Sequence, residues 1–327
     1  MSKLQELLKE TRYKTSETAR RMATRYQESE LLDMLEQQNQ ERERLIRKYG
    51  RIDISDVELM KFEIGNYMGT IIEQINFDYG HLIPEDKLVK LNNMLYNDCV
   101  IVIDDPKDRH DFSADTRIGK VIVNLARIAK TDEEPEPDIY RKIAVANGCL
   151  PHEIFHMIIT MLKQEELADE RMIINLKNGL QITARGMVGF MLNEGFVEKF
   201  SSEFAERNGL YHQIAPQYLP YVDICNFIME QHEDVNENTI FSLEAHEIIL
   251  RLTPEEQQEY YDAETISYAV RHRDLNADDI ANTKIQIEEL PYKISPERKK
   301  ELMNYMLLKE QKFEETVALP TSRRRLF

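Results

Sequence analysis

Pro151-His152-Glu153-Ile154-Phe155-His156 is the stretch of sequence that decides how this chain is interpreted. It matches the pattern H-E-x-x-H, and the apolar residues around it favour a helix. On a helix, residues four apart lie on one face, so His152 and His156 can present two imidazole nitrogens to one cation. Glu153 lies about 100° around the helix from His152, which places it beside the cation and not on it. We expect Pro151 to be the first helical residue, because proline is favoured at that position.

The polar side chains of this stretch predict a catalytic zinc site. Zinc lowers the pKa of a bound water towards about 7, and Glu153 can take a proton from that water and pass it to a leaving amine. Burying two imidazoles and a carboxylate among apolar residues without a cation would be costly. The alternative is a pair of core or surface histidines without a metal. A G-x-S-x-G motif is absent from the sequence, so no serine nucleophile competes with this interpretation.

A second motif lies downstream, in Met191-Leu192-Asn193-Glu194-Gly195-Phe196-Val197-Glu198. Together with H-E-x-x-H it resembles the gluzincin metallopeptidases, the clan of thermolysin and the zinc aminopeptidases. The resemblance covers about residues 115–232 and implies that Glu194 is the third zinc ligand. It also implies that Asn193 and Glu198 each form a hydrogen bond with a zinc-bound histidine. Two carboxylates four residues apart would repel each other unless a cation and an imidazole N–H lay between them, which agrees with the resemblance.

The spacing of the two motifs departs from the pattern of the clan. Between His156 and Glu194 lie 37 residues, about twice as many as in the best-known members, so we expect an insertion near residues 163–180 to be looped out. Reserve candidates for the third ligand lie in this polar stretch, namely Glu165, Glu166 and Glu170.

A metallopeptidase also needs a donor that stabilises the oxyanion of the tetrahedral intermediate, and this donor is usually Tyr or His in the clan. We single out Tyr218, because it precedes Pro220, a natural helix start that would hold the tyrosine hydroxyl near the rim of a cleft. Weaker candidates also follow the helix that carries Glu194, namely Tyr211, His212 and Tyr221. For each of them the alternative is an ordinary packed side chain.

The remaining sequence predicts an α+β fold that is mostly helical. Two apolar runs, Val100 to Ile103 and Lys120 to Leu125, are typical of short strands and suggest a small antiparallel sheet. The resemblance implies a zincin-like catalytic domain, in which the edge strand of such a sheet lies above the active-site helix and binds an extended peptide. The strand from Lys120 is placed to do so. Helical patterns cover residues 139–163, 181–208, 220–232 and 296–315.

Residues 1–97 and 98–327 differ in character and predict two regions. The first is an N-terminal helical region, in which Gly50 would end one helix and Ser55 or Asp56 would cap the next. The second is the metallopeptidase domain with its C-terminal helices. The N-terminal helices could mediate self-association through a coiled coil, or they could pack on their own domain.

Charge and composition narrow the class of protein further. The 327 residues include 42 Lys and Arg against 59 Asp and Glu, a formal charge of −17, which argues against a nucleic-acid-binding protein. The sequence contains no run of about 18 apolar residues, so it predicts no membrane helix. The first residues lack the apolar core of a signal peptide. We therefore expect a cytoplasmic protein, with signal-independent export left open. Cys99, Cys149 and Cys225 have no paired spacing and predict free thiols.

These features together predict a zinc-dependent metallopeptidase that acts on a peptide or protein substrate. His152, His156 and Glu194 would hold Zn²⁺, and Glu153 would be the general base. The alternative is a non-catalytic helical interaction or regulatory protein with a structural zinc.

Overall fold

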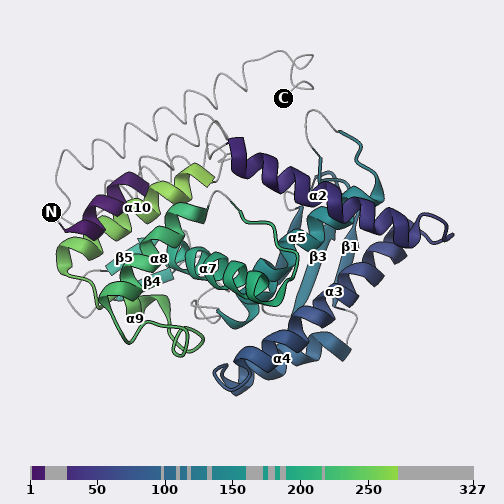
Figure 1. Cartoon of the computed structure of the whole chain (residues 1–327). Helices are drawn as coiled ribbons and strands as arrows, with labels where there is room; N and C mark the ends of the chain where they lie inside the picture. Colours follow the sequence, from purple (N-terminus) through teal and green to yellow (C-terminus); the bar gives the residue numbers. More distant parts are fainter. Residues whose placement is uncertain are drawn as a thin grey trace, which may run out of the picture. The chain divides into compact units, whose positions relative to one another are not determined.

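The fold is α+β and mostly helical, as the sequence predicts (Figure 1). The computed structural model describes residues 2–11, 28–96, 99–107, 111–115, 119–130, 135–159, 172–175, 181–184, 189–215 and 218–271. The labelled helices are α2 (Glu28–Tyr49), α3 (Asp56–Tyr79), α4 (Glu85–Tyr96), α5 (Ile139–Ile158), α7 (Phe190–Asn208), α8 (Leu219–Gln231), α9 (Ala245–Ile249) and α10 (Pro254–Arg271). The strands are β1 (Val100–Ile103), β2 (Phe112–Asp115), β3 (Lys120–Asn124), β4 (Met172–Asn175) and β5 (Gln181–Ala184). None of the described helices is long and apolar enough to cross a lipid bilayer.

The chain forms two compact units, each assembled from separate stretches of sequence. Unit 1 comprises residues 1–20, 162–190 and 252–327, and its described part contains the antiparallel pair β4–β5 and α10. Unit 2 comprises residues 21–161 and 191–251 and contains both sequence motifs. The residues on either side of position 98 belong to unit 2, so the division predicted there does not separate these units.

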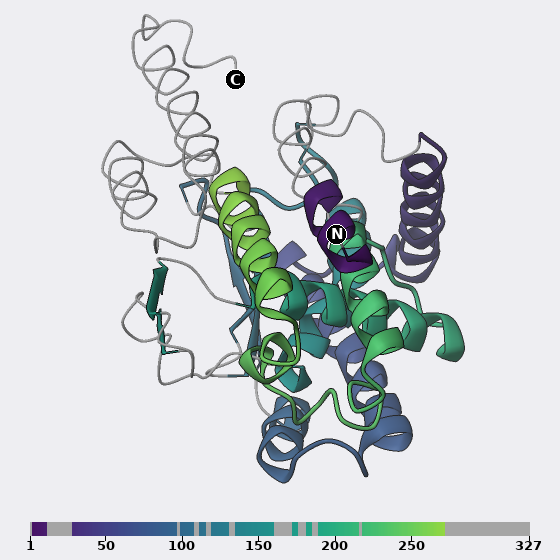
Figure 2. The ribbon, with the colours of Figure 1, turned by 90° about the vertical axis from the view of Figure 1, so that its left-hand side faces the viewer.

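The N-terminal helices of unit 2 pack on their own unit. α2 ends at Tyr49 as predicted, and the side chain of Ser55 caps α3 by accepting the backbone N–H of Glu58. α3 and α4 form an antiparallel pair, joined by hydrogen bonds between the amides of Asn76 and Asn92 (Figures 1 and 2). Both α2 and α3 contact α5. Self-association through these helices stays a prediction.

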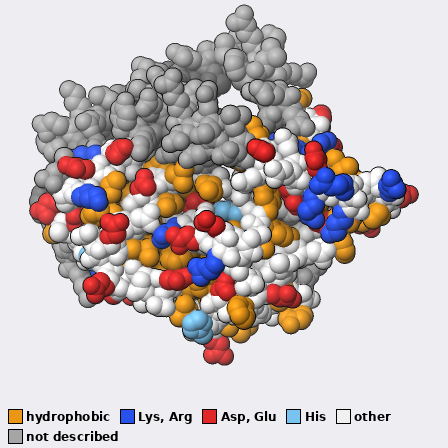
Figure 3. Space-filling model, viewed as in Figure 1, with side chains coloured by type: hydrophobic (Ala, Val, Ile, Leu, Met, Phe, Trp, Pro, Cys, Tyr) orange, Lys and Arg blue, Asp and Glu red, His pale blue; other side chains and the backbone are white. Residues whose placement is uncertain are grey.

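Basic side chains gather over α2, although the chain as a whole is acidic (Figure 3). Arg44 and Lys48 both pair with Glu63, a carboxylate of α3 that is only 3% exposed. Arg42 pairs with Asp138 at the start of α5. These ion pairs connect α2 with α3 and with the start of α5.

The apolar core of unit 2 lies where α3, α5 and α7 meet. It includes a group of aromatic rings, Tyr79, Phe155, Phe204 and Phe241. Tyr79 contacts the other three rings and Phe155 also contacts Phe204, with centroids 5.2–6.2 Å apart. Phe155 belongs to the H-E-x-x-H motif and is fully buried. The apolar face of α5 therefore anchors the motif in the core, while the opposite face carries its polar residues.

The three-stranded sheet of unit 2 is mixed, with the strand order β1-β3-β2. β1 runs parallel to β3, so the prediction that these two strands form an antiparallel sheet is wrong. The antiparallel partner of β3 is β2, a strand that the sequence does not predict. β3 occupies the centre, because both of its edges are paired. The prediction that the strand from Lys120 binds a peptide at the sheet edge is therefore wrong, and the edge strand that contacts α5 is β2.

Pro151 lies in the interior of α5, so the prediction that it begins the helix is wrong. The helix begins at Ile139, behind Asp138, whose side chain accepts the backbone N–H of Arg141. Pro151 has no N–H to donate to the carbonyl of Asn147, which weakens the helix at this point. Burial of the apolar residues on α5 offsets that loss, because tertiary packing supplies most of the stability of a helix.

Two other helices are predicted over residues 181–208 and 296–315. The helix expected over residues 181–208 begins only at Phe190, because residues 181–184 form β5. The predicted start at residue 181 is wrong, because a strand and a helix follow each other closely within one apolar stretch. The helix expected over residues 296–315 lies outside the described residues.

Candidate metal centre

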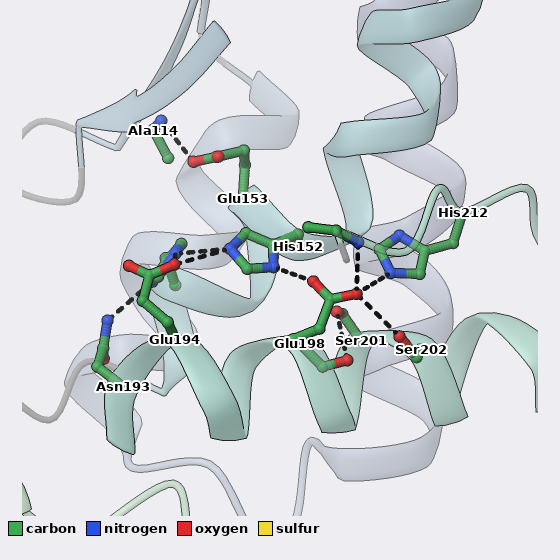
Figure 4. Close-up of polar contacts among 11 residues, drawn as sticks. Ala114, His152, Glu153, Asn193, Glu194, Glu198, Ser201, Ser202 and His212 are labelled. Atoms are coloured by element: carbon green, nitrogen blue, oxygen red, sulfur yellow. Dashed lines mark hydrogen bonds and ion pairs between the residues drawn. The ribbon is translucent and has the colours of Figure 1, made fainter. Parts of the chain in front are cut away.

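Polar side chains from α5 and α7 meet inside unit 2 (Figure 4). His152, Glu153 and His156 come from α5, and Glu194 and Glu198 come from α7. The four-residue spacing on each helix turns the paired residues to one face, as expected. Two carboxylates of α7 are buried here beside two imidazoles, and Glu198 is only 1% exposed.

His152, His156 and Glu194 form a group that could hold a metal ion. The Nε2 atoms of the two histidines are 3.1 Å apart. Oε2 of Glu194 lies 3.3 Å from Nε2 of His152 and 3.7 Å from Nε2 of His156. Two ligands of a tetrahedral ion with bonds of about 2.0–2.1 Å are separated by roughly 3.3–3.4 Å, so the observed separations suit such an ion.

The donor chemistry of the group also fits a cation. Oε2 of Glu194 is buried and has no well-formed hydrogen bond within the described structure. An ionised carboxylate oxygen without a partner is costly to bury, and a cation would remove that cost. Two imidazole nitrogens and one carboxylate oxygen are the ligand set of several catalytic zinc sites.

Each histidine is oriented through its Nδ1 atom, as the resemblance implies. Nδ1 of His152 lies 2.8 Å from Oε2 of Glu198 and can only donate to this carboxylate, which leaves Nε2 with its lone pair. Nδ1 of His156 lies 3.1 Å from Nδ2 of Asn193. Rotating the Asn193 amide by 180° would bring its oxygen to this position, where it would accept the Nδ1 proton and leave Nε2 for a cation.

Without a cation, the carboxylates stabilise the protonated form of His152. Burial lowers the pKa of His152, but the hydrogen bonds and charges of Glu194 and Glu198 outweigh it and raise this pKa to about 10. Burial raises the pKa of Glu198, yet its contacts with His152 and His212 lower it to about 2. Burial also raises the pKa of Glu194, but the attraction of both imidazoles outweighs it and places this pKa well below its usual range. Both carboxylates are therefore ionised at neutral pH. A bound cation would replace the proton that His152 carries here.

Glu153 points away from the three ligand atoms towards the sheet (Figure 4). Its Oε2 accepts the backbone N–H of Ala114 in β2 at 2.8 Å. Burial raises the pKa of Glu153, while the nearby His156 and His152 and the Ala114 N–H lower it; the net result is a raised pKa. The carboxyl group is thus held between the metal ligands and the edge strand, where a proton acceptor for hydrolysis would be needed.

Tyr218 also lies at the site, and its ring stacks on the ring of His152. The centroids are 5.1 Å apart and the planes are inclined by 8°. Tyr218 occupies the N-cap position of α8 without a capping hydrogen bond from its side chain, and Pro220 lies in the first turn of this helix, as predicted. The stacking places Tyr218 against a candidate ligand, whereas its role as an oxyanion donor stays a prediction.

The weaker candidates for that donor are held elsewhere in unit 2. Tyr221 is buried beneath α7, with its backbone carbonyl close to Gly195. The hydroxyl of Tyr211 packs near Gly148 of α5. His212 contacts Glu198 on the side away from Glu194 (Figure 4). The reserve ligands Glu165, Glu166 and Glu170 lie outside the described residues.

Sequence reasoning missed two participants. Ala114 acts through its backbone in a four-residue strand, Phe-Ser-Ala-Asp, that has no apolar pattern. From the sequence, His212 is only a weaker candidate for the oxyanion donor. Nothing in its local sequence predicts its contact with Glu198.

Comparison with protein-family models, with curated proteins and with solved structures finds no match to this chain. The candidate metal centre therefore stands on the geometry of its own residues.

Proposed function

We propose that this chain is a zinc-dependent metallopeptidase of gluzincin type, with His152, His156 and Glu194 as zinc ligands. One observation carries the proposal: three buried ligand atoms lie 3.1–3.7 Å apart, on residues whose spacing matches H-E-x-x-H and a downstream glutamate. Without a metal, the buried Oε2 atom of Glu194 has contacts with the two imidazoles at 3.3 and 3.7 Å but no well-formed hydrogen bond. Three protein ligands leave one position of a tetrahedral ion open, which is typical of catalytic and not structural zinc sites.

Zinc and Glu153 would have separate roles in the proposed reaction. Zinc would supply Lewis-acid polarisation of a peptide carbonyl and acidification of water. Glu153 would accept the water proton on its carboxylate and then donate it to the leaving amine. Its raised pKa suits this exchange, because a carboxyl group that gains and loses a proton works best when its pKa is nearer to neutral.

One edge of β2 pairs with no strand among the described residues, and this free edge supports a peptide as the substrate. Ala114 is paired with Val121 of β3, yet its N–H points to Glu153 and therefore away from β3. In an antiparallel pair the N–H and the carbonyl of one residue point to the same side, so the Ala114 carbonyl also faces the free edge. An extended peptide could bind there through its backbone, next to Glu153.

Replacing Glu153 by Gln tests the proposal. The Glu153→Gln variant should bind zinc as the wild type does and lose hydrolysis of a peptide library, because an amide cannot accept the water proton. Glu203→Gln, at an exposed residue of α7 that pairs with Lys199, is the matched control and should keep full activity. Hydrolysis by the Glu153→Gln variant would contradict the mechanism.

A structural zinc in a non-catalytic interaction protein is the competing proposal. It predicts that zinc binds stoichiometrically, that no peptide is cleaved, and that a chelator unfolds the chain. Chelation followed by circular dichroism separates the two proposals. A catalytic site in a preformed core would lose its metal and keep its helices.

A further inference from the structure

Glu198 is the most completely buried carboxylate of the site, and several donors converge on it. Its Oε2 accepts from Nδ1 of His152. Its Oε1 accepts the backbone N–H of Ala215 at 3.1 Å and the hydroxyl of Ser202 at 3.3 Å. Nε2 of His212 faces the same oxygen at 3.4 Å, as an ion-pair contact (Figure 4). Glu198 therefore links His152 to the loop that follows α7.

The ring of His212 faces oxygen atoms on both sides. Nδ1 lies 3.1 Å from the backbone carbonyl of Gly148, which can only accept a hydrogen bond. Nε2 faces the ionised carboxylate of Glu198, which also can only accept. The side chain is only 4% exposed, so the ring is held between these two acceptors inside the unit.

The loop that carries His212 is fastened to α5 at Gly148. The backbone N–H of Gln213 donates to the Gly148 carbonyl at 2.8 Å. A Cβ atom on Gly148 would lie 2.8 Å from Cβ of Gln213, so only glycine allows this approach. The side chain of Gln213 in turn accepts from Gln38 of α2 at 2.6 Å. These contacts aim the His212 ring at Glu198.

We propose that His212 is a positioning residue for the metal centre: its buried imidazole lies between the Gly148 carbonyl and Glu198 and holds the Glu198 carboxylate against His152. The chain of contacts runs from the Gly148 carbonyl through His212 and Glu198 to His152, which links α5, the loop and α7 and returns to α5. The fixed carboxylate keeps the proton of His152 on Nδ1 and turns Nε2 towards the metal. Without His212, Glu198 would lose one of the groups that hold its carboxylate in place.

The inference rests on the zinc site of the proposed function but not on peptide hydrolysis, so zinc affinity is the measurement. His212→Gln in the full chain should weaken zinc binding about tenfold in a chelator competition, the lower end of the range for residues that orient metal ligands. His81→Gln, at an exposed histidine in the turn between α3 and α4, is the control and should leave the affinity unchanged. Equal zinc affinity of the His212→Gln variant and the wild type would overturn the proposal.

A double-variant cycle distinguishes positioning through Glu198 from a general loss of stability. If His212 acts through Glu198, adding His212→Gln to Glu198→Gln should weaken zinc binding no further. Additive losses would overturn the proposal.

The outcomes also separate this inference from the proposed function. A chain that binds zinc, responds to His212→Gln and cleaves no peptide would overturn the peptidase and leave the positioning role intact. A wild-type chain that binds no zinc would overturn both.

Discussion

The two histidines of the candidate metal centre are supported in different ways. On the Glu198 side, formed by His152, Glu198 and His212, the support is an ionised carboxylate that is itself held by several donors. On the Asn193 side, formed by His156, Asn193 and Gly195, the support is a neutral amide and the close packing of α7 on α8. The two candidate ligands on α5, His152 and His156, therefore differ in the group that orients them. A carboxylate makes its histidine more basic, whereas an amide only orients the ring.

The largest effect should come from removing either ligand. His152→Ala and His156→Ala should each weaken zinc binding more than about a hundredfold, because even residues that only orient ligands cost 10–100-fold. Metal analysis combined with chelator competition measures the loss. The comparison predicts a second difference: His152→Ala should also destabilise the metal-free protein more, because it takes from Glu198 one of its partners in the core. Equal stability of the two variants would show that the two sides are alike.

Acid should weaken the Glu198 side through protonation of Glu198 itself. The pKa of Glu198 is about 2 in the folded protein, below its usual 4.5, so its stabilising contribution is complete above pH 4.5 and is lost as the pH falls towards 2. This contribution is on the order of 3 kcal/mol at neutral pH. Urea unfolding of the metal-free protein at pH 6 and pH 3.5 should show a smaller decrease for Glu198→Gln than for the wild type. Asn193 has no proton to gain, so Asn193→Ala should retain the wild-type decrease.

Zinc affinity should rank the two supports in the same order. Glu198→Gln removes a charge and should weaken zinc binding by 10–100-fold, while Asn193→Ala should cost about tenfold at most. Chelator competition at constant pH and ionic strength provides the comparison. A greater loss for Asn193→Ala would reverse the proposed ranking.

The parts of this site that could be predicted from the sequence are those fixed by local helix geometry. The shared face of His152 and His156 follows from a four-residue spacing, and no other part of the chain is needed to predict it. Glu194 could be chosen only through a resemblance, because 37 residues separate it from His156 and helix periodicity says nothing over that distance. The contact between the two helices depends on how the apolar core assembles.

The predictions that the structure contradicts also depend on contacts between residues far apart in the sequence. Pro151 was placed at a helix start because proline is most common there, but the cap at Asp138 and the buried face of α5 determine where the helix begins. The pairing of the strands is non-local, so the apolar runs of β1 and β3 could not reveal that they are parallel. β2 is short and lacks an apolar pattern, and the sheet recruits it through its backbone. The role of His212 depends on a loop docking at Gly148, which no periodicity encodes.

The smallest predicted effect concerns packing on the Asn193 side. A Cβ atom on Gly195 would lie 2.6 Å from the Tyr221 carbonyl oxygen and 2.7 Å from Sγ of Cys225, closer than these atoms can approach. Gly195→Ala should therefore force α7 and α8 apart and destabilise the protein by about 1–3 kcal/mol, the usual cost of overpacking a core. Since Gly195 follows Glu194, zinc binding should weaken as well.

Gly65 in α3 provides the matched control, because a Cβ atom there would meet nothing within 4 Å. Gly65→Ala should stabilise the protein by about 0.5–1 kcal/mol, since alanine loses less conformational entropy than glycine on forming a helix. Denaturant unfolding of the two variants should thus give opposite signs at two helical glycines. If both substitutions stabilised the chain, α8 would not constrain α7 at this point, and the Asn193 side would depend on the amide alone.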